Sequence, residues 1–181
     1  MRFLIALPIG AFIGGFLLRF VSAAYLTAFA MYLSAAGFFA MSHWEFDALN
    51  SGWATLVLMA CGFGFGLAVA PVNDALLAAT EDRVHGLASA LLIVARMVGM
   101  LVGISALTTL GLQAFRRAVS QLPPVTELCE GKQTACAAYG AAMRDAGIAQ
   151  LQAVFSGAMV CALIAGTLAF FVLHARASVK I

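Results

Sequence analysis

Charged side chains are scarce in this chain, and their scarcity excludes a soluble globular domain. Only 10% of the 181 residues are Asp, Glu, Lys or Arg, whereas 64% are apolar. Water-soluble surfaces carry charge at about 25–35% of their positions. The net charge of +2 is small and no basic cluster is present, so the sequence predicts no nucleic-acid partner. The lipid bilayer is therefore the predicted solvent and partner.

Groupings of catalytic or metal-binding residues are also lacking. The histidines His43, His85 and His174 lie far apart along the chain. The sequence contains neither the four-cysteine spacing of a zinc site nor a Walker A phosphate-binding motif. We therefore predict that the chain is not an enzyme and that it binds no cofactor or metal.

Long apolar runs account for most of the sequence, whose mean hydropathy is +1.01. About 20 apolar residues in a helix are needed to cross the hydrocarbon core of a bilayer. In lipid the backbone must be paired within the segment, which makes such runs helices. The predicted fold is an all-α polytopic membrane protein in the plasma membrane, a single membrane domain over residues 1–181. Its five predicted spans are 3–18, 23–42, 53–77, 86–112 and 153–173.

The longest polar segment, 113–152, contains two cysteines, Cys129 and Cys136. Their spacing is compatible with a small loop closed by a disulfide, or with two free thiols. A disulfide would place 113–152 on the oxidising, extracytoplasmic side and the C-terminus in the cytoplasm. The distribution of Lys and Arg between the loops does not decide the orientation. Because the N-terminus would then lie outside, and the first span is short, we expect the chain to be the C-terminal part of a larger protein.

A lone arginine, Arg96, lies inside the apolar run 86–112. A charge at that depth is costly by roughly 2.5 kcal/mol or more, so it commonly serves binding, proton transfer or gating. Arg96 is predicted to pair with a proton-carrying carboxylate; a structural ion pair or snorkelling to the headgroups are the alternatives. Asp74, near the end of the third span, is the nearest acid and a second candidate for coupling or gating. A headgroup-level acid is its alternative role.

Small residues recur within the spans, and in lipid they let helix backbones approach closely. We predict helix packing at five glycines: Gly62, Gly64, Gly66, Gly99 and Gly103. Adaptable methionines and phenylalanines suit varied apolar ligands. Candidate substrate-cavity residues are Met59, Phe63, Phe65, Met97 and Met100, with packing or lipid contact as the alternative.

Four short motifs occur together in the order typical of one transporter family. They are Gly62-Phe63-Gly64-Phe65-Gly66, Ala70-Pro71, Gly86-Leu87-Ala88-Ser89 and Ala95-Arg96-Met97-Val98-Gly99. The stretch they cover resembles the late helices of the major facilitator superfamily, in particular the fourteen-helix drug:proton antiporters of actinobacterial type. The loop after the first span departs from that family's pattern, keeping only a glycine and Arg19 of its gating motif.

This resemblance implies that the five spans are the last five helices of a proton-coupled exporter of drugs or lipids. Its implied partners are the remaining N-terminal helices, an apolar or amphipathic small-molecule substrate, and protons. The alternative is a freestanding five-helix accessory or assembly subunit without transport activity of its own.

Overall fold

The computed structural model describes residues 2–44, 52–123 and 137–179, and in these residues the chain is entirely helical. The helices are α1 (Arg2–Leu17), α2 (Ala23–Ser42), α3 (Gly52–Leu77), α4 (His85–Ser120) and α6 (Ala137–Val179), with a short 3-10 turn, η2 (Asp82–Val84), before α4. By length and composition, α2, α3, α4 and α6 can each cross a membrane. The apolar part of α1, Ile5–Leu17, is shorter than a span. The all-helical prediction is confirmed, whereas four rather than five helices reach spanning length in the described residues.

The helices α4 and α6 are longer than the sequence predicts. Helix α4 continues to Ser120, and α6 begins at Ala137, so most of the segment 113–152 is helix rather than loop. Both helices therefore extend beyond the predicted spans into this segment. Hydropathy shows where a helix leaves the apolar layer, whereas alanine-rich and long straight side chains let the helix continue beyond it. Both cysteines of the predicted disulfide, Cys129 and Cys136, lie outside the described residues.

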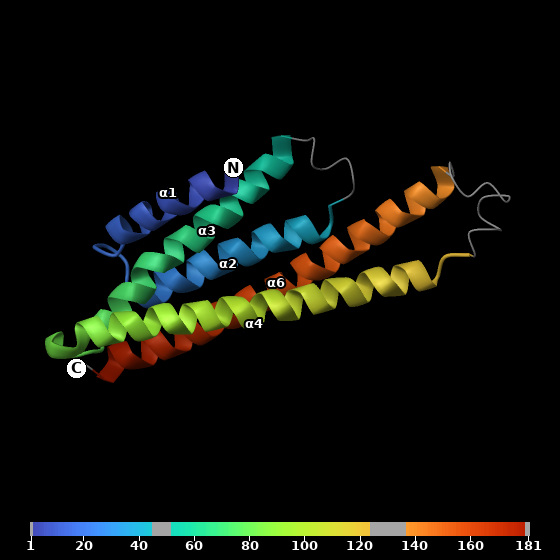
Figure 1. Ribbon diagram of the computed structural model, residues 1–181. Coiled ribbons are helices and arrows are strands. Elements are labelled where there is room, and N and C mark those ends of the chain that lie inside the picture. The colour runs from blue at the N-terminus through green and yellow to red at the C-terminus, as the bar shows by residue number, and fades with distance from the viewer. Residues whose placement is uncertain (1, 45–51, 124–136, 180–181) are drawn as a thin grey trace.

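Spatial order differs from chain order. Helix α1 packs on α3, α3 on α2, α2 on α6, and α6 on α4, while α4 and α3 touch only slightly. Figure 1 shows α4 and α6 running side by side in opposite directions, with their far ends extending past α1, α2 and α3. The molecule therefore has a packed part around α3 and a long helix pair at one side.

The packed part rests on glycines that place backbone against backbone. A methyl group added at Gly66 would overlap the carbonyl oxygen of Leu7, and one added at Gly10 would overlap that of Phe63. On the other face of α3, a Cβ at Gly64 would lie 2.9 Å from the carbonyl oxygen of Ala30. Glycine is required at these positions because α3 lies against both α1 and α2 without room for a side chain.

Two apolar clusters fill the space beside these close approaches. Leu26, Ala30, Leu67 and Ala68 join α2 to α3, and Met41, Val57 and Cys61 join the same helices nearer the end of α2. The buried hydroxyl of Ser34 donates to the carbonyl oxygen of Ala30 at 3.0 Å, so it brings no unpaired donor into the core.

Candidate functional site on helix α4

The candidate site lies in the N-terminal third of α4, where Arg96 interrupts an apolar surface. Arg96 is exposed, and so are its apolar neighbours Ile93, Met97 and Met100. Among the described residues it forms no hydrogen bond or ion pair. The described helices therefore leave this guanidinium without a counter-charge, within a helix apolar enough to span a membrane.

Helical periodicity places Arg96 on the same side of α4 as the residues that contact other helices. Residues three or four apart share a helix face, so Leu92, Arg96, Gly99, Gly103 and Leu107 form one stripe. At one end, Leu92 lines a cavity of about 230 Å³ with residues of α3. At the other end, the Leu107 side chain lies 3.0 Å from where a Cβ of Gly157 on α6 would stand. Arg96 thus occupies an uncovered interval between two contacts.

The two glycines of this interval, Gly99 and Gly103, have no neighbouring helix beside them among the described residues. A Cβ added at Gly99 or Gly103 would meet no atom within 4 Å among the described residues. The packing role of Gly99 and Gly103 therefore stays a prediction. Gly62, Gly64 and Gly66 are instead buried in α3. The difference arises because α3 lies between two neighbouring helices, whereas α4 has a close neighbour mainly in α6.

The second predicted coupling residue, Asp74, lies on the last turns of α3 and is exposed. Its neighbour Asn73 lines the α3–α4 cavity together with Ser89 and Leu92. In the part of the chain that is described, Asp74 and Arg96 form no ion pair. The structure therefore brings Asp74 to the same end of α4 as the candidate site without joining the two charges.

The five candidate substrate-cavity residues are divided between two helices that barely touch. Phe63 and Phe65 of α3 pack against the two apolar clusters, and the rings of Phe65 and Phe38 are 5.8 Å apart. Met59 is 38% exposed on α3, and Met97 and Met100 are more than half exposed on α4. Their role in substrate binding stays a prediction.

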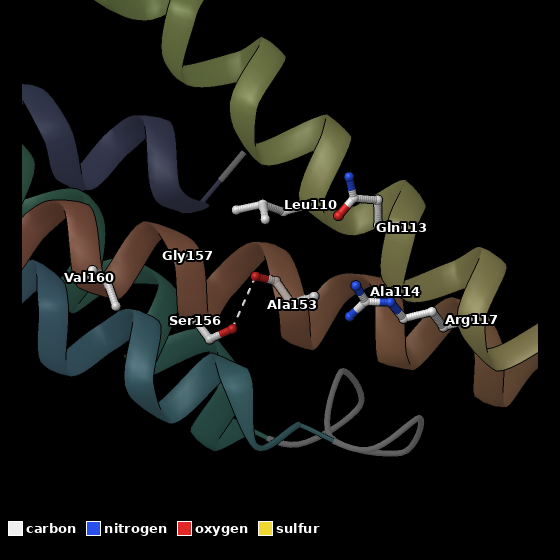
Figure 2. A pocket seen from close by; sticks show the side chains of 8 residues that line it. All are labelled: Leu110, Gln113, Ala114, Arg117, Ala153, Ser156, Gly157 and Val160. Atoms are coloured by element: carbon white, nitrogen blue, oxygen red, sulfur yellow. Dashed lines mark hydrogen bonds between the residues drawn. The ribbon is translucent and has the colours of Figure 1, made fainter.

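A cavity that sequence reasoning missed lies further along the helix pair. Residues of α4 and α6, among them Gln113, Arg117 and Ser156, line a space of about 310 Å³ (Figure 2). The sequence prediction placed Arg117 at the start of a loop, which separated it from the span. The spacing of Val102, Ala106, Thr109, Gln113 and Arg117 continues one helix face across that supposed boundary, and it is the signal that could have identified the cavity.

Comparison with known proteins shows similarity to mycobacterial transporters. The chain is 40% identical over 147 residues to a triacylglyceride transporter of Mycolicibacterium hassiacum. The alignment covers 74% of this chain and 28% of the relative. It is 40% identical over 131 residues to the triacylglyceride transporter of Mycolicibacterium smegmatis, covering 67% of the chain and 23% of the relative. It is 34% identical over 174 residues to the triacylglyceride transporter of Mycobacterium tuberculosis H37Rv. That alignment covers 88% of this chain and 33% of the relative. The chain therefore spans about a quarter to a third of the length of these relatives.

These findings correct the predicted family. No family model matches the chain, and the relatives are named for triacylglyceride transport rather than as drug:proton antiporters. The assignment to the antiporter family of the major facilitator superfamily is therefore wrong. The relatives are named as transporters and not as enzymes. Together with four helices of spanning length, they support a multi-pass membrane protein.

Proposed function

We propose that this chain provides membrane-spanning helices of a transporter that exports neutral lipids of the triacylglyceride class. The supporting observation is the identity of 34–40% to triacylglyceride transporters over 67–88% of the chain. The apolar, largely exposed surface of α4 suits such a substrate, because a triester carries no charge and needs few polar contacts. The loop joining α4 and α6 is proposed to lie outside the cell and the C-terminus inside.

Within this proposal, Arg96 lines the transport path and serves the coupling of transport to protons. An exposed guanidinium in the interior of an apolar helix favours a water-accessible path over direct lipid contact, because hydrocarbon leaves the charge unsolvated. The uncovered interval around Gly99 leaves room beside it. Protonation of a facing carboxylate would release Arg96 and change the shape of the path. Asp74, at the end of α3, is proposed as a charge at the mouth of the same path.

The test reconstitutes the complete gene product in proteoliposomes and measures transfer of radiolabelled triacylglyceride under an imposed pH gradient. We expect transfer by the natural protein, at least a tenfold loss in Arg96→Ala, and partial recovery in Arg96→Lys, which keeps the charge. Arg116→Ala is the matched control, because it removes an exposed arginine of the same helix beyond the apolar run and should leave transfer intact.

Each outcome bears on a different part of the proposal. Absence of triacylglyceride transfer by the natural protein, with correct insertion, would overturn the transport function. Unchanged transfer by Arg96→Ala would remove Arg96 from the path. Transfer that continues at full rate after the pH gradient is collapsed would contradict proton coupling while leaving lipid transport standing.

A further inference from the structure

The cavity between the far halves of α4 and α6 combines a cation with an apolar wall. Figure 2 shows the Arg117 side chain running from α4 toward Ala153 and Ser156, in the space between the two helices. Leu110, Gly157 and Val160 form the apolar side of the same space. Such a combination is amphipathic, and it matches a ligand with a charged end and a hydrocarbon end.

The polar end of the cavity offers hydrogen-bond donors. The hydroxyl of Ser156 already donates to the carbonyl oxygen of Ala153 at 3.0 Å, so its proton is committed. The guanidinium of Arg117 and the amide of Gln113 supply the remaining side-chain donors of the lining. In the described residues no carboxylate pairs with Arg117. Within the described residues, the Arg117 guanidinium therefore keeps its donors for an anion.

Beside the apolar end lies an open apolar surface formed by α4 alone. Leu110 belongs to both, and this surface extends along α4 to Leu101. The hydroxyl of Thr109 in this wall donates to the carbonyl oxygen of Ser105 at 2.8 Å, so it does not present a free donor to hydrocarbon. From Leu101 to Arg117 the helix rises about 24 Å. That length exceeds the roughly 15 Å half-thickness of a bilayer core, so the groove is long enough for one acyl chain.

The position of Arg117 identifies the anion. It lies five residues, or about 7.5 Å along the helix, beyond the apolar run 86–112, which places it at the level where lipid headgroups lie. Guanidinium groups bind phosphate oxygens in a bidentate manner, and basic pockets between transmembrane helices bind anionic headgroups. An uncharged triester gains nothing comparable from a guanidinium, so the ligand is distinct from the proposed transported lipid.

We propose that the groove between α4 and α6 binds an anionic phospholipid, with its phosphate at Arg117 and an acyl chain along α4 toward Leu101. The bound lipid fills the space between two helices that otherwise leave it open, and so stabilises their far halves. This site does not depend on the transport activity proposed above, because its ligand and its readout are different.

The experiment uses the complete gene product in detergent and measures bound lipid by native mass spectrometry, together with the thermal unfolding midpoint. Phosphatidylglycerol is the anionic probe, phosphatidylcholine the zwitterionic control and inorganic phosphate the free-anion control. We expect phosphatidylglycerol to bind at least tenfold more tightly than phosphatidylcholine and to raise the unfolding midpoint, and phosphate to do neither.

Matched variants separate a built site from general charge attraction. Arg117→Gln should remove the preference for phosphatidylglycerol, whereas Arg116→Gln, which removes the neighbouring exposed charge, should keep it. Ser156→Leu fills the groove while leaving Arg117 in place, and it should weaken binding by a similar factor. If Arg117→Gln does not fold, the Ser156→Leu variant still tests whether lipid binds in the groove.

Three results would overturn the site. The first is equal loss in the Arg116 and Arg117 variants, which indicates nonspecific attraction. The second is full competition by inorganic phosphate, which indicates an anion site without an acyl-chain groove. The third is unchanged lipid binding in Ser156→Leu, which indicates that lipid binds elsewhere. The same result is expected if a second copy of the chain occupies the groove.

Discussion

Helices α3 and α4 are almost equally apolar, but their surroundings differ completely. Their most apolar windows have mean hydropathies of 2.0 and 2.2, whereas 44% of the α3 window and only 6% of the α4 window is buried. In lipid, apolar surface gains little by leaving the solvent, so hydropathy does not decide which helix packs. Close approach between helix backbones decides which helix packs, and the glycines of α3 allow that approach. Three variants test this difference.

The largest effect is expected from Gly66→Ala in the packed part of the molecule. The added methyl group meets the carbonyl oxygen of Leu7 and the backbone nitrogen of Ala11 at 2.9 Å. Because these are backbone atoms of α1 that cannot rotate away, we expect a loss of about 1–3 kcal/mol in the free energy of unfolding. The measurement is an unfolding titration of the complete gene product in mixed micelles. Unchanged stability would show that α1 does not pack on α3.

A smaller loss is expected from Ser34→Ala, which removes a hydrogen bond and adds no atoms, at the α2–α3 interface on the other face of α3. The Ser34 hydroxyl is fully buried and lies 3.4 Å from the carbonyl oxygen of Cys61 on α3, in addition to its bond within α2. Hydrogen bonds between membrane helices contribute about 0.6 kcal/mol on average. The same titration should therefore detect a loss of about that size. A loss as large as that of Gly66→Ala would indicate that this hydrogen bond contributes as much to α2–α3 packing as close backbone approach contributes to α1–α3 packing.

The smallest effect is expected from Gly99→Ala on the uncovered stripe of α4. It makes the same chemical change as Gly66→Ala, and both sites are helical, so the two variants differ only in their surroundings. With no atom within 4 Å of the added methyl group, stability should change by no more than about 0.5 kcal/mol. A loss comparable to that of Gly66→Ala would mean that another helix covers this stripe in the complete protein, and would contradict the open path proposed around Arg96.

Sequence reasoning predicted the apolar helices better than their ends or their partners. The span 23–42 coincides with α2, and the span 53–77 differs from α3 by one residue. The C-terminal end of α4 and the start of α6 were missed because hydropathy falls at the edge of the apolar layer while helix propensity does not. The family assigned from short motifs was wrong, because glycine-rich steps and an Ala-Arg pair recur wherever membrane helices pack or line a path.

The sequence by itself determined that this protein is helical, that its helices suit a bilayer, and that one arginine lies within an apolar helix. These properties depend on composition and local periodicity, which each segment carries alone. Only the tertiary structure decided that Gly66 meets a backbone while Gly99 does not, and that Arg117 shares a cavity with Ser156 across two helices. Both depend on which helix lies beside which, and in an apolar solvent that choice follows from shape complementarity between distant segments rather than from their hydropathy.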